Sequence, residues 1–177
     1  AERAVYTYGY HIYFTSNHDE NSWAGTEFER MGDGHKTFAA LCATLDGMPL
    51  IYSGQEEPLR KRLAFFEKDT IPFKDYAYEG FYTTLNQLKK KNQALWNGEH
   101  GGLSRRINES NEVYAFIREK NGDKFIGVFN LSGKPQKTTL QVPVTEMNIV
   151  FTDDRLTLDT GQNINLGPWE FFLFSSK

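Results

Sequence analysis

The segment Tyr13-Phe14-Thr15-Ser16-Asn17-His18-Asp19-Glu20 constrains the fold of this chain more than any other. The stretch over residues 9–16 is apolar and aromatic, which is typical of a strand, and it ends abruptly at three polar side chains. In parallel α/β structures, functional side chains gather where a strand ends and the next loop begins. The segment therefore predicts a strand of a parallel sheet with Asn17, His18 and Asp19 at its carboxyl end.

The remainder of the first hundred residues alternates between helix and strand patterns. Residues 35–46 have apolar side chains at helical spacing, and Gly47 follows where a left-handed capping residue is expected. Residues 48–53 form a continuous apolar run, which is typical of a strand buried on both faces. Residues 75–91 predict a second helix with Phe81, Leu85 and Leu88 on its apolar face, while residues 17–34 and 54–74 are expected to be long loops. The order strand, helix, strand, helix indicates a parallel sheet.

The second part of the chain has a different texture, with short strand patterns separated by turns. Asn121-Gly122 is a strong hairpin signal between expected strands at residues 112–118 and 124–130. Further strands are expected at residues 138–142, 147–151 and 169–174, which together predict an antiparallel β-sandwich. Because both patterns break near residues 97–102, we predict an α/β domain over residues 1–100 and an all-β domain over residues 101–177.

Composition excludes several classes of function. The net charge of −3 provides no long-range attraction for nucleic acid or for an anionic membrane surface, and no apolar run reaches the length of a membrane span. A single cysteine, Cys42, excludes an internal disulfide, and its helical, apolar surroundings predict a buried thiol. The pair Asp153-Asp154 lacks the spacing of a calcium loop, so we expect a turn and no metal site. The chain does not begin with Met, and we make no prediction of its localisation.

Asp19 is the first candidate for a functional carboxylate. Cleavage of a glycosidic bond passes through a positively charged, oxocarbenium-like state, which a neighbouring carboxylate stabilises. His18 can donate a hydrogen bond to a sugar hydroxyl, and Asn17 can either join that binding site or fix the turn through a local hydrogen bond. The structural alternative is that Asp19 caps backbone amides at the start of the loop.

A second motif supports the first. The segment Gly47-Met48-Pro49-Leu50-Ile51-Tyr52-Ser53-Gly54-Gln55-Glu56 ends another apolar strand pattern with a glycine and a carboxylate. Gly54 allows a tight turn there. If the two strands are parallel neighbours, Glu56 lies at the same edge as Asp19, and we expect it to support the site from behind rather than to contact substrate.

These motifs resemble those of a known enzyme family. The run Phe14-Thr15-Ser16-Asn17-His18-Asp19 resembles the strand-seven motif of the α-amylase family of glycoside hydrolases (family 13), and residues 47–56 resemble its strand-eight motif. Residues 61–71 are similar to the loop that follows strand eight in many members, and residues 85–95 to the last barrel helix. Residues 103–177 are similar to the family's C-terminal β-sandwich in size and rhythm.

The resemblance implies a fold and a function. The chain would comprise the last two β/α units of a (β/α)8 TIM barrel followed by an antiparallel β-sandwich. Asp19 would be the transition-state-stabilising carboxylate of a retaining enzyme that acts on starch or maltooligosaccharides, with His18 and Asn17 binding substrate and Glu56 and Gly54 supporting them. The family's nucleophile and general-acid motifs do not occur in this sequence, so we expect the isolated chain to be inactive. No cofactor is expected here, although the resemblance implies that an intact parent enzyme can bind calcium.

Two other functions remain open at this stage. The family also includes transglycosylases and isomerising enzymes, which its fold does not distinguish. A noncatalytic carbohydrate-binding module is a further alternative, with Trp96 or Trp169 as a platform, and Trp23 can also stack on a sugar. Two barrel strands without partners leave unpaired edges, so we expect self-association, packing onto the sandwich, or a second chain that supplies the rest.

Overall fold

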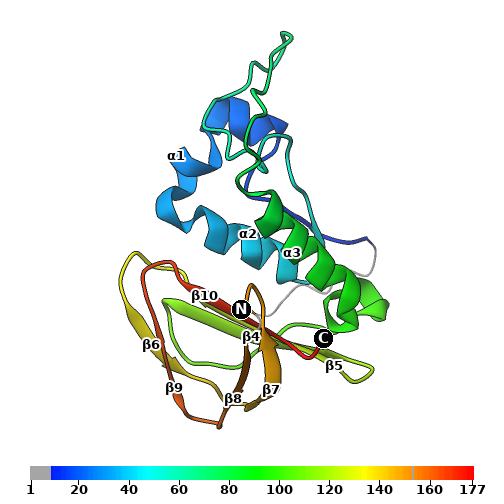
Figure 1. Ribbon diagram of the computed structural model, residues 1–177, viewed down its shortest axis with the longest axis vertical. Coiled ribbons are helices and arrows are strands. Elements are labelled where there is room, and N and C mark those ends of the chain that lie inside the picture. Colours follow the sequence, from blue (N-terminus) through cyan, green and yellow to red (C-terminus); the bar gives the residue numbers. More distant parts are fainter. Residues whose placement is uncertain (1–8, 153) are drawn as a thin grey trace.

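The computed structural model describes residues 9–152 and 154–177. Its helical N-terminal part lies over one face of a β-sheet, and a small second sheet covers the other face (Figure 1). Residues 1–8 of the predicted α/β domain lie outside the described residues. Asp153, one of the two aspartates of an expected turn in the all-β domain, also lies outside them.

The N-terminal part has the expected order of strand, helix, strand and helix. Strands β1 and β2 pair in parallel, with Ile12 opposite Met48 and Tyr13 opposite Pro49. Helix α2 connects them, and α3 follows β2 after a long loop. The elements are β1 (Ile12–Tyr13), η1 (Glu20–Ala24), α1 (Glu27–Met31), η2 (Gly32–Gly34), α2 (His35–Thr44), β2 (Met48–Pro49), α3 (Glu79–Lys91), η3 (Gln93–Leu95) and η4 (Gly98–His100).

Two expectations for this part are wrong. Residues 17–34 are not one loop, because short helices occupy most of them; Thr26 and Glu29 form a reciprocal capping box that starts α1. Residues 48–53 do not form a strand buried on both faces, because only Met48–Pro49 is paired and the Met48, Leu50 and Ile51 side chains are exposed. Among the described residues β2 has one strand neighbour, β1, so its other edge is not paired with a strand.

Gly47 also has a different role from the one expected. Helix α2 ends at Leu45 in an extended conformation, and Gly47 does not have a positive φ. A Cβ atom on Gly47 would lie 2.5 Å from the carbonyl oxygen of His11 and 2.7 Å from the ring of Tyr13. Glycine is therefore required by the close approach of two chain segments rather than by a helix cap.

The antiparallel architecture expected for the C-terminal part is confirmed. A six-stranded sheet has the order β3-β4-β5-β10-β7-β8, and a two-stranded sheet pairs β6 with β9. Asn121 and Gly122 have φ values of 48° and 88°, which form the tight turn between β4 and β5. The strands are β3 (Arg105–Arg106), β4 (Val113–Lys120), β5 (Asp123–Asn130), β6 (Gln136–Thr139), β7 (Val144–Ile149), β8 (Arg155–Leu158), β9 (Asn163–Leu166) and β10 (Phe171–Ser175).

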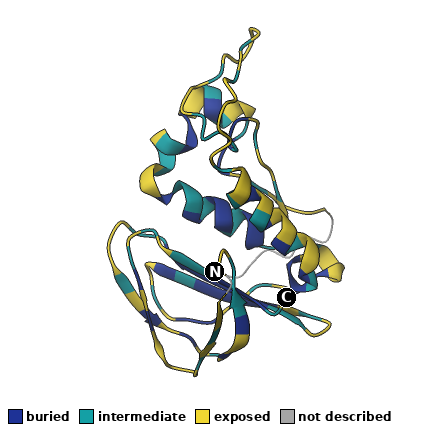
Figure 2. Cartoon of the chain, viewed as in Figure 1, coloured by how far each residue is buried: buried dark blue, intermediate teal, exposed yellow. Residues whose placement is uncertain are grey.

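The central strands of the six-stranded sheet are buried on both faces, as their dark colour in Figure 2 shows. On one face, Ile117, Val128 and Met147 belong to a cluster that the β6–β9 sheet closes through Ile164 and Leu166. On the other face, side chains of the sheet pack against those of α2, α3 and η3. That second cluster is Ala40, Ala43, Leu85, Leu88, Ala94, Leu95, Phe116, Phe125, Phe129 and Leu173. The two predicted domains thus share a hydrophobic core.

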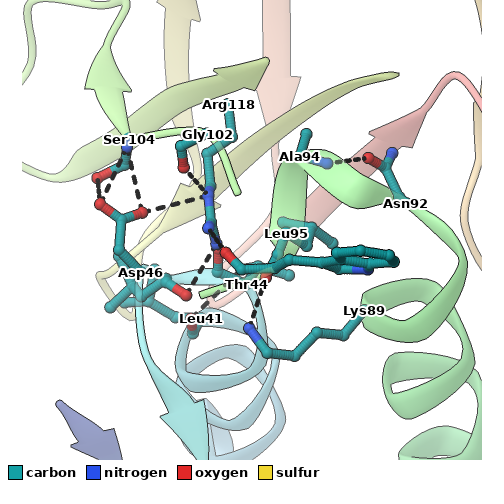
Figure 3. Close-up of polar contacts among 12 residues, drawn as sticks. Leu41, Thr44, Asp46, Lys89, Asn92, Ala94, Leu95, Gly102, Ser104 and Arg118 are labelled. Carbon is teal, nitrogen blue, oxygen red and sulfur yellow. Dashed lines mark hydrogen bonds and ion pairs between the residues drawn. The ribbon is translucent and has the colours of Figure 1, made fainter. Parts of the chain in front are cut away.

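A buried arginine joins the same two parts (Figure 3). Arg118 of β4 is 1% exposed, and its Nε atom lies 3.2 Å from the Asp46 carboxylate beyond the end of α2. Its guanidinium also donates to backbone carbonyls on three segments: Gly102 O at 2.7 Å, Thr44 O at 2.8 Å, Leu45 O at 2.9 Å and Trp96 O at 2.7 Å. The planar, multiply donating guanidinium therefore satisfies carbonyls that the end of α2 and the following loops leave unpaired.

Candidate functional site

Asn17 fixes the turn that follows β1. Its side-chain oxygen accepts the backbone N–H of Glu20 at 2.7 Å, and its main-chain oxygen accepts that of Asn21 at 2.9 Å. These bonds start the helical turn η1. The local role expected for Asn17 is therefore observed, and its side-chain oxygen is engaged in the turn rather than directed freely toward a ligand.

His18 and Asp19 point away from the protein interior. Their side chains are 69% and 59% exposed, and His18 Nε2 lies 3.6 Å from Asp19 Oδ2. Asp19 occupies the N-cap position of η1 but makes no side-chain hydrogen bond to it. The capping alternative for Asp19 is thus wrong, because Asn17 makes that bond instead. The carboxylate and the imidazole form an adjacent anion and hydrogen-bond donor on the surface.

The loop after β2 lies at the same edge of the parallel pair. Gly54 has a φ of 97°, in the region that favours glycine, and its N–H donates to Glu56 Oε2 at 3.0 Å. The main-chain oxygen of Glu56 accepts the N–H of Tyr78 at 2.9 Å. Glu56 therefore closes its own loop, and its supporting role in a site stays a prediction.

Beneath this surface, a buried polar network joins the two strand ends. Gln55 Nε2 lies 2.6 Å from Glu27 Oε2, 2.8 Å from Thr15 Oγ1 and 3.0 Å from the Tyr82 hydroxyl, while Gln55 Oε1 accepts the N–H of Tyr52 at 2.7 Å. Thr15 Oγ1 also donates to Glu27 Oε2 at 2.9 Å. Burial raises the pKa of Glu27, against the opposing effect of its hydrogen bonds with Thr15 and Gln55.

Two polar atoms of this region have no hydrogen-bond partner among the described residues. They are Ser16 Oγ and Glu27 Oε1, and both residues line a cavity of about 10 Å³ next to Gly54 and Gln55. A cavity of this size approaches the space of one water molecule, and it offers the polar partners that an internal water requires.

Arg30 braces the loop after β1, and hydrogen bonds between the two loops tie it to the loop after β2. Arg30 donates to Thr15 O and, at 3.0 Å, to Gly25 O, and it pairs with Glu20 at 3.1 Å. Across the site, Asn21 accepts the N–H of Leu63 at 2.7 Å. The loops after β1 and β2 are therefore one connected structure.

The sequence did not identify Thr15, Glu27, Gln55 or Arg30 as parts of this site. The capping-box spacing of Thr26 and Glu29 was a local signal for α1, the helix on which Glu27 and Arg30 lie. These side chains meet only because residues far apart in the chain pack together, and the spacing of residues within one segment does not predict such contacts.

The other aromatic candidates differ in their surroundings. Trp169 is half-buried, its ring centre is 5.9 Å from that of Phe38, and a Cβ atom on Gly34 would lie 2.9 Å from it. The Trp169 ring therefore packs against the protein rather than standing free as a platform. Trp96 is 42% exposed and donates its indole N–H to Lys90 O at 3.3 Å, whereas Trp23 is 63% exposed.

The potential metal ligands, the cysteine and the helix lengths complete the description of the chain. Over residues 9–152 and 154–177, no group of three or more His, Cys, Asp or Glu side chains is arranged to hold a metal ion. Cys42 is a free thiol in α2 that is half-buried rather than fully buried as predicted, and its partial burial raises its pKa to about 11, which disfavours the reactive thiolate. None of the described helices has the length and apolar character needed to cross a membrane.

Comparison with known proteins relates this architecture to amylases. Residues 105–173 match the family model of the maltogenic amylase C-terminal domain. No curated protein matches the sequence significantly. The chain shares its fold with the noncanonic maltogenic α-amylase AmyB from Thermotoga neapolitana, at a TM-score of 0.71 and 20% identity, over 93% of this chain and 40% of that one.

Two further solved structures are similar. The α-amylase from Geobacillus thermoleovorans, complexed with acarbose, has a TM-score of 0.69 and 15% identity, over 93% of this chain and 38% of that one. The trehalulose synthase MutB from Pseudomonas mesoacidophila MX-45 has a TM-score of 0.66 and 18% identity, over 95% of this chain and 43% of that one. The chain spans 38–43% of the length of these three structures. The resemblance to the C-terminal part of α-amylase-family enzymes is thereby confirmed, and the comparisons do not distinguish between individual reactions.

Proposed function

We propose that this chain, whose residues 105–173 match the maltogenic amylase C-terminal domain, is the C-terminal part of a retaining glycoside hydrolase that acts on α-glucans. The observation that carries the proposal is the placement of Asn17-His18-Asp19 and Gly54-Gln55-Glu56 a few residues beyond the carboxyl ends of two parallel, hydrogen-bonded strands. In this proposal, β1 and β2 are the last two strands of a (β/α)8 barrel. The acarbose complex of the Geobacillus α-amylase supports an α-glucan as the ligand class.

Asp19 would act on the sugar whose glycosidic bond is cleaved. Its carboxylate would accept hydrogen bonds from ring hydroxyls, and these bonds would strengthen as the ring flattens and gains positive charge. His18 would donate to a neighbouring hydroxyl. The nucleophile and general acid would come from other barrel strands, so this chain alone would bind sugar without cleaving it.

Exposed apolar side chains on the parallel strands and just after β2 support the same proposal. Ile12 is 53% exposed, and Met48, Leu50 and Ile51 are 37–39% exposed. Unpaired strand edges with apolar side chains favour association with further strands. We expect this face to be covered by the remaining barrel in an intact enzyme and to cause self-association of the isolated chain, which sedimentation velocity measures. A monodisperse monomer would contradict this expectation.

The proposed role of Asp19 is tested in an enzyme that contains both this chain and a complete barrel. Asp19→Asn preserves the shape of the side chain but removes its charge, so we expect α-glucan turnover to fall by about 10²- to 10³-fold. Asp33→Asn, at another exposed aspartate of the same segment, is the matched control and should retain activity. An Asp19→Asn enzyme with normal turnover would refute the assignment.

Transglycosylation or isomerisation is the second candidate reaction, and the similarity to a trehalulose synthase favours keeping it. Hydrolysis of maltoheptaose yields only shorter oligosaccharides, whereas transfer also yields longer or differently linked products. Product analysis on α-1,4- and α-1,6-linked substrates distinguishes the two.

Calcium dependence stays a prediction for the intact enzyme, and activity with and without a chelator tests it.

A further inference from the structure

Three large aromatic side chains gather on the surface beside the candidate site. Trp23 is 63% exposed, Phe65 38% and Phe66 80%. The ring centres are 5.2 Å apart for Trp23 and Phe65, 4.8 Å for Phe65 and Phe66, and 6.2 Å for Trp23 and Phe66. Single exposed hydrophobic residues are common, but a contiguous exposed cluster marks a surface that binds something.

This aromatic cluster, defined as Trp23, Phe65 and Phe66, continues directly from the candidate carboxylate. The imidazole of His18 stacks on Phe65, with ring centres 6.1 Å apart and planes 27° apart. His18 in turn lies 3.6 Å from Asp19. Apolar rings and hydroxyl-binding groups are therefore neighbours on one surface.

The cluster is held in place by its own loops. Phe65 and Phe66 lie on the long loop between β2 and α3, which projects away from the sheet in Figure 1 and is largely exposed in Figure 2. Leu63 N–H donates to Asn21 Oδ1 at 2.7 Å, and Ser22 Oγ donates to Leu63 O at 2.7 Å, which tie this loop to the segment that carries Trp23. A preorganised binding surface loses less conformational entropy when a ligand binds.

Charges on the loop that carries Phe65 and Phe66 are balanced by neighbouring charges of opposite sign. Lys61 pairs with Asp69 inside the loop, and Arg62 contacts Glu29 at 3.0 Å. Glu67 and Lys68, which follow Phe66, have opposite signs. The surroundings thus favour a neutral ligand over a strongly charged one.

We propose that the aromatic cluster is a platform on which a pyranose ring of an α-glucan stacks, next to the glucose unit held by His18 and Asp19. A pyranose has an apolar C–H face that contacts aromatic rings, and its hydroxyl rim reaches polar groups beside them. The inference rests on the proposed function, because it takes its ligand class from the site at Asp19. It adds Trp23, Phe65 and Phe66 as binding residues outside the Asn17-His18-Asp19 motif.

The test is a titration of the ¹⁵N-labelled chain with maltoheptaose. The chain has 3 tryptophans, and the indole N–H signal of Trp23 is identified by its loss in Trp23→Phe. We expect the Trp23 signal to shift saturably while those of Trp96 and Trp169 stay unchanged. Phe66→Ala should weaken binding at least about fivefold, since an aromatic contact of this kind contributes ~1 kcal/mol.

The matched control is Phe73→Ala, which removes an exposed ring that stacks on Tyr76 rather than on the cluster. We expect Phe73→Ala to bind maltoheptaose as the unaltered chain does. An unshifted Trp23 signal, or equal affinity for Phe66→Ala, would overturn the platform. Binding of the hydrophobic dye ANS at Trp23 without a response to sugar would also overturn it, and would indicate a protein-covered surface instead.

The two proposals fail separately. If Asp19→Asn abolishes turnover of the intact enzyme but the indole N–H signal of Trp23 does not shift with maltoheptaose, the proposed function stands and the platform is wrong. If Trp23 responds while Asp19→Asn leaves turnover normal, the platform stands and the catalytic assignment is wrong.

Discussion

Replacing Arg118 tests how the two halves of the chain are joined. Arg118→Met removes the guanidinium but keeps an apolar side chain about as long as the aliphatic part of the arginine, so the loss reports mainly on polar contacts. In the native structure these contacts include the ion pair with Asp46 and four hydrogen bonds to backbone carbonyls. The Arg118 side chain is 1% exposed and that of Asp46 is 8% exposed, so water replaces the lost bonds poorly.

The expected loss is large relative to the stability of a domain. Removing one partner of a buried ion pair costs ~3–5 kcal/mol, mostly because the remaining charge and acceptors stay buried without compensation. A domain of ordinary stability has ~5–15 kcal/mol in total. We therefore expect Arg118→Met to lower the free energy of unfolding by ~4 kcal/mol.

Urea denaturation followed by tryptophan fluorescence measures this loss. The surface pair of Lys124 and Glu119, 3.2 Å apart and 40% and 51% exposed, supplies the control: Lys124→Met should change stability by less than ~0.5 kcal/mol. Adding Asp46→Asn to Arg118→Met should restore part of the stability, because it removes the uncompensated charge and keeps an acceptor for Ser104. A loss below ~1 kcal/mol for Arg118→Met would refute this account of the buried arginine.

Three further predictions concern the segments around the candidate site. Because burial raises the pKa of Glu27, the native state binds its proton more tightly than the unfolded chain, so this group lowers stability as pH rises above about 4.5 and through the raised pKa. Glu27→Gln should therefore gain stability relative to the unaltered chain over that window, as urea unfolding at several pH values measures; a constant difference would contradict it. Gly47→Ala should cost ~1–3 kcal/mol, since its Cβ would meet backbone at 2.5 Å, whereas Gly80→Ala, which has open space in α3, should not destabilise; equal melting temperatures for the two variants would disprove this. Asn17→Ala should lower the free energy of unfolding by ~1 kcal/mol because the capping hydrogen bond is lost, whereas Asp19→Ala should leave it nearly unchanged. A larger loss for Asp19→Ala than for Asn17→Ala would show instead that Asp19 is the cap.

Local patterns in the sequence predicted much of the secondary structure. The order of strand, helix, strand and helix, the amphipathic α3 helix, and the hairpin at Asn121-Gly122 each depend on neighbours within a few residues. The strands that were missed, β3, β8 and β9, are two to four residues long. Segments this short carry too little periodicity to separate them from turns.

The sequence alone also placed Asn17, His18 and Asp19 after one strand and Gly54 and Glu56 after its neighbour, since residue order determines which side chains lie just beyond the end of a strand. Only the tertiary structure decided which of these side chains are engaged: Asn17 caps the turn, while Asp19 stays exposed. The Gln55–Glu27 network, the Arg118 junction and the aromatic cluster join residues far apart in the chain. Such contacts form only when the strands and loops pack together, because hydrogen bonds and ring contacts act over a few ångströms and leave no periodic trace in the sequence.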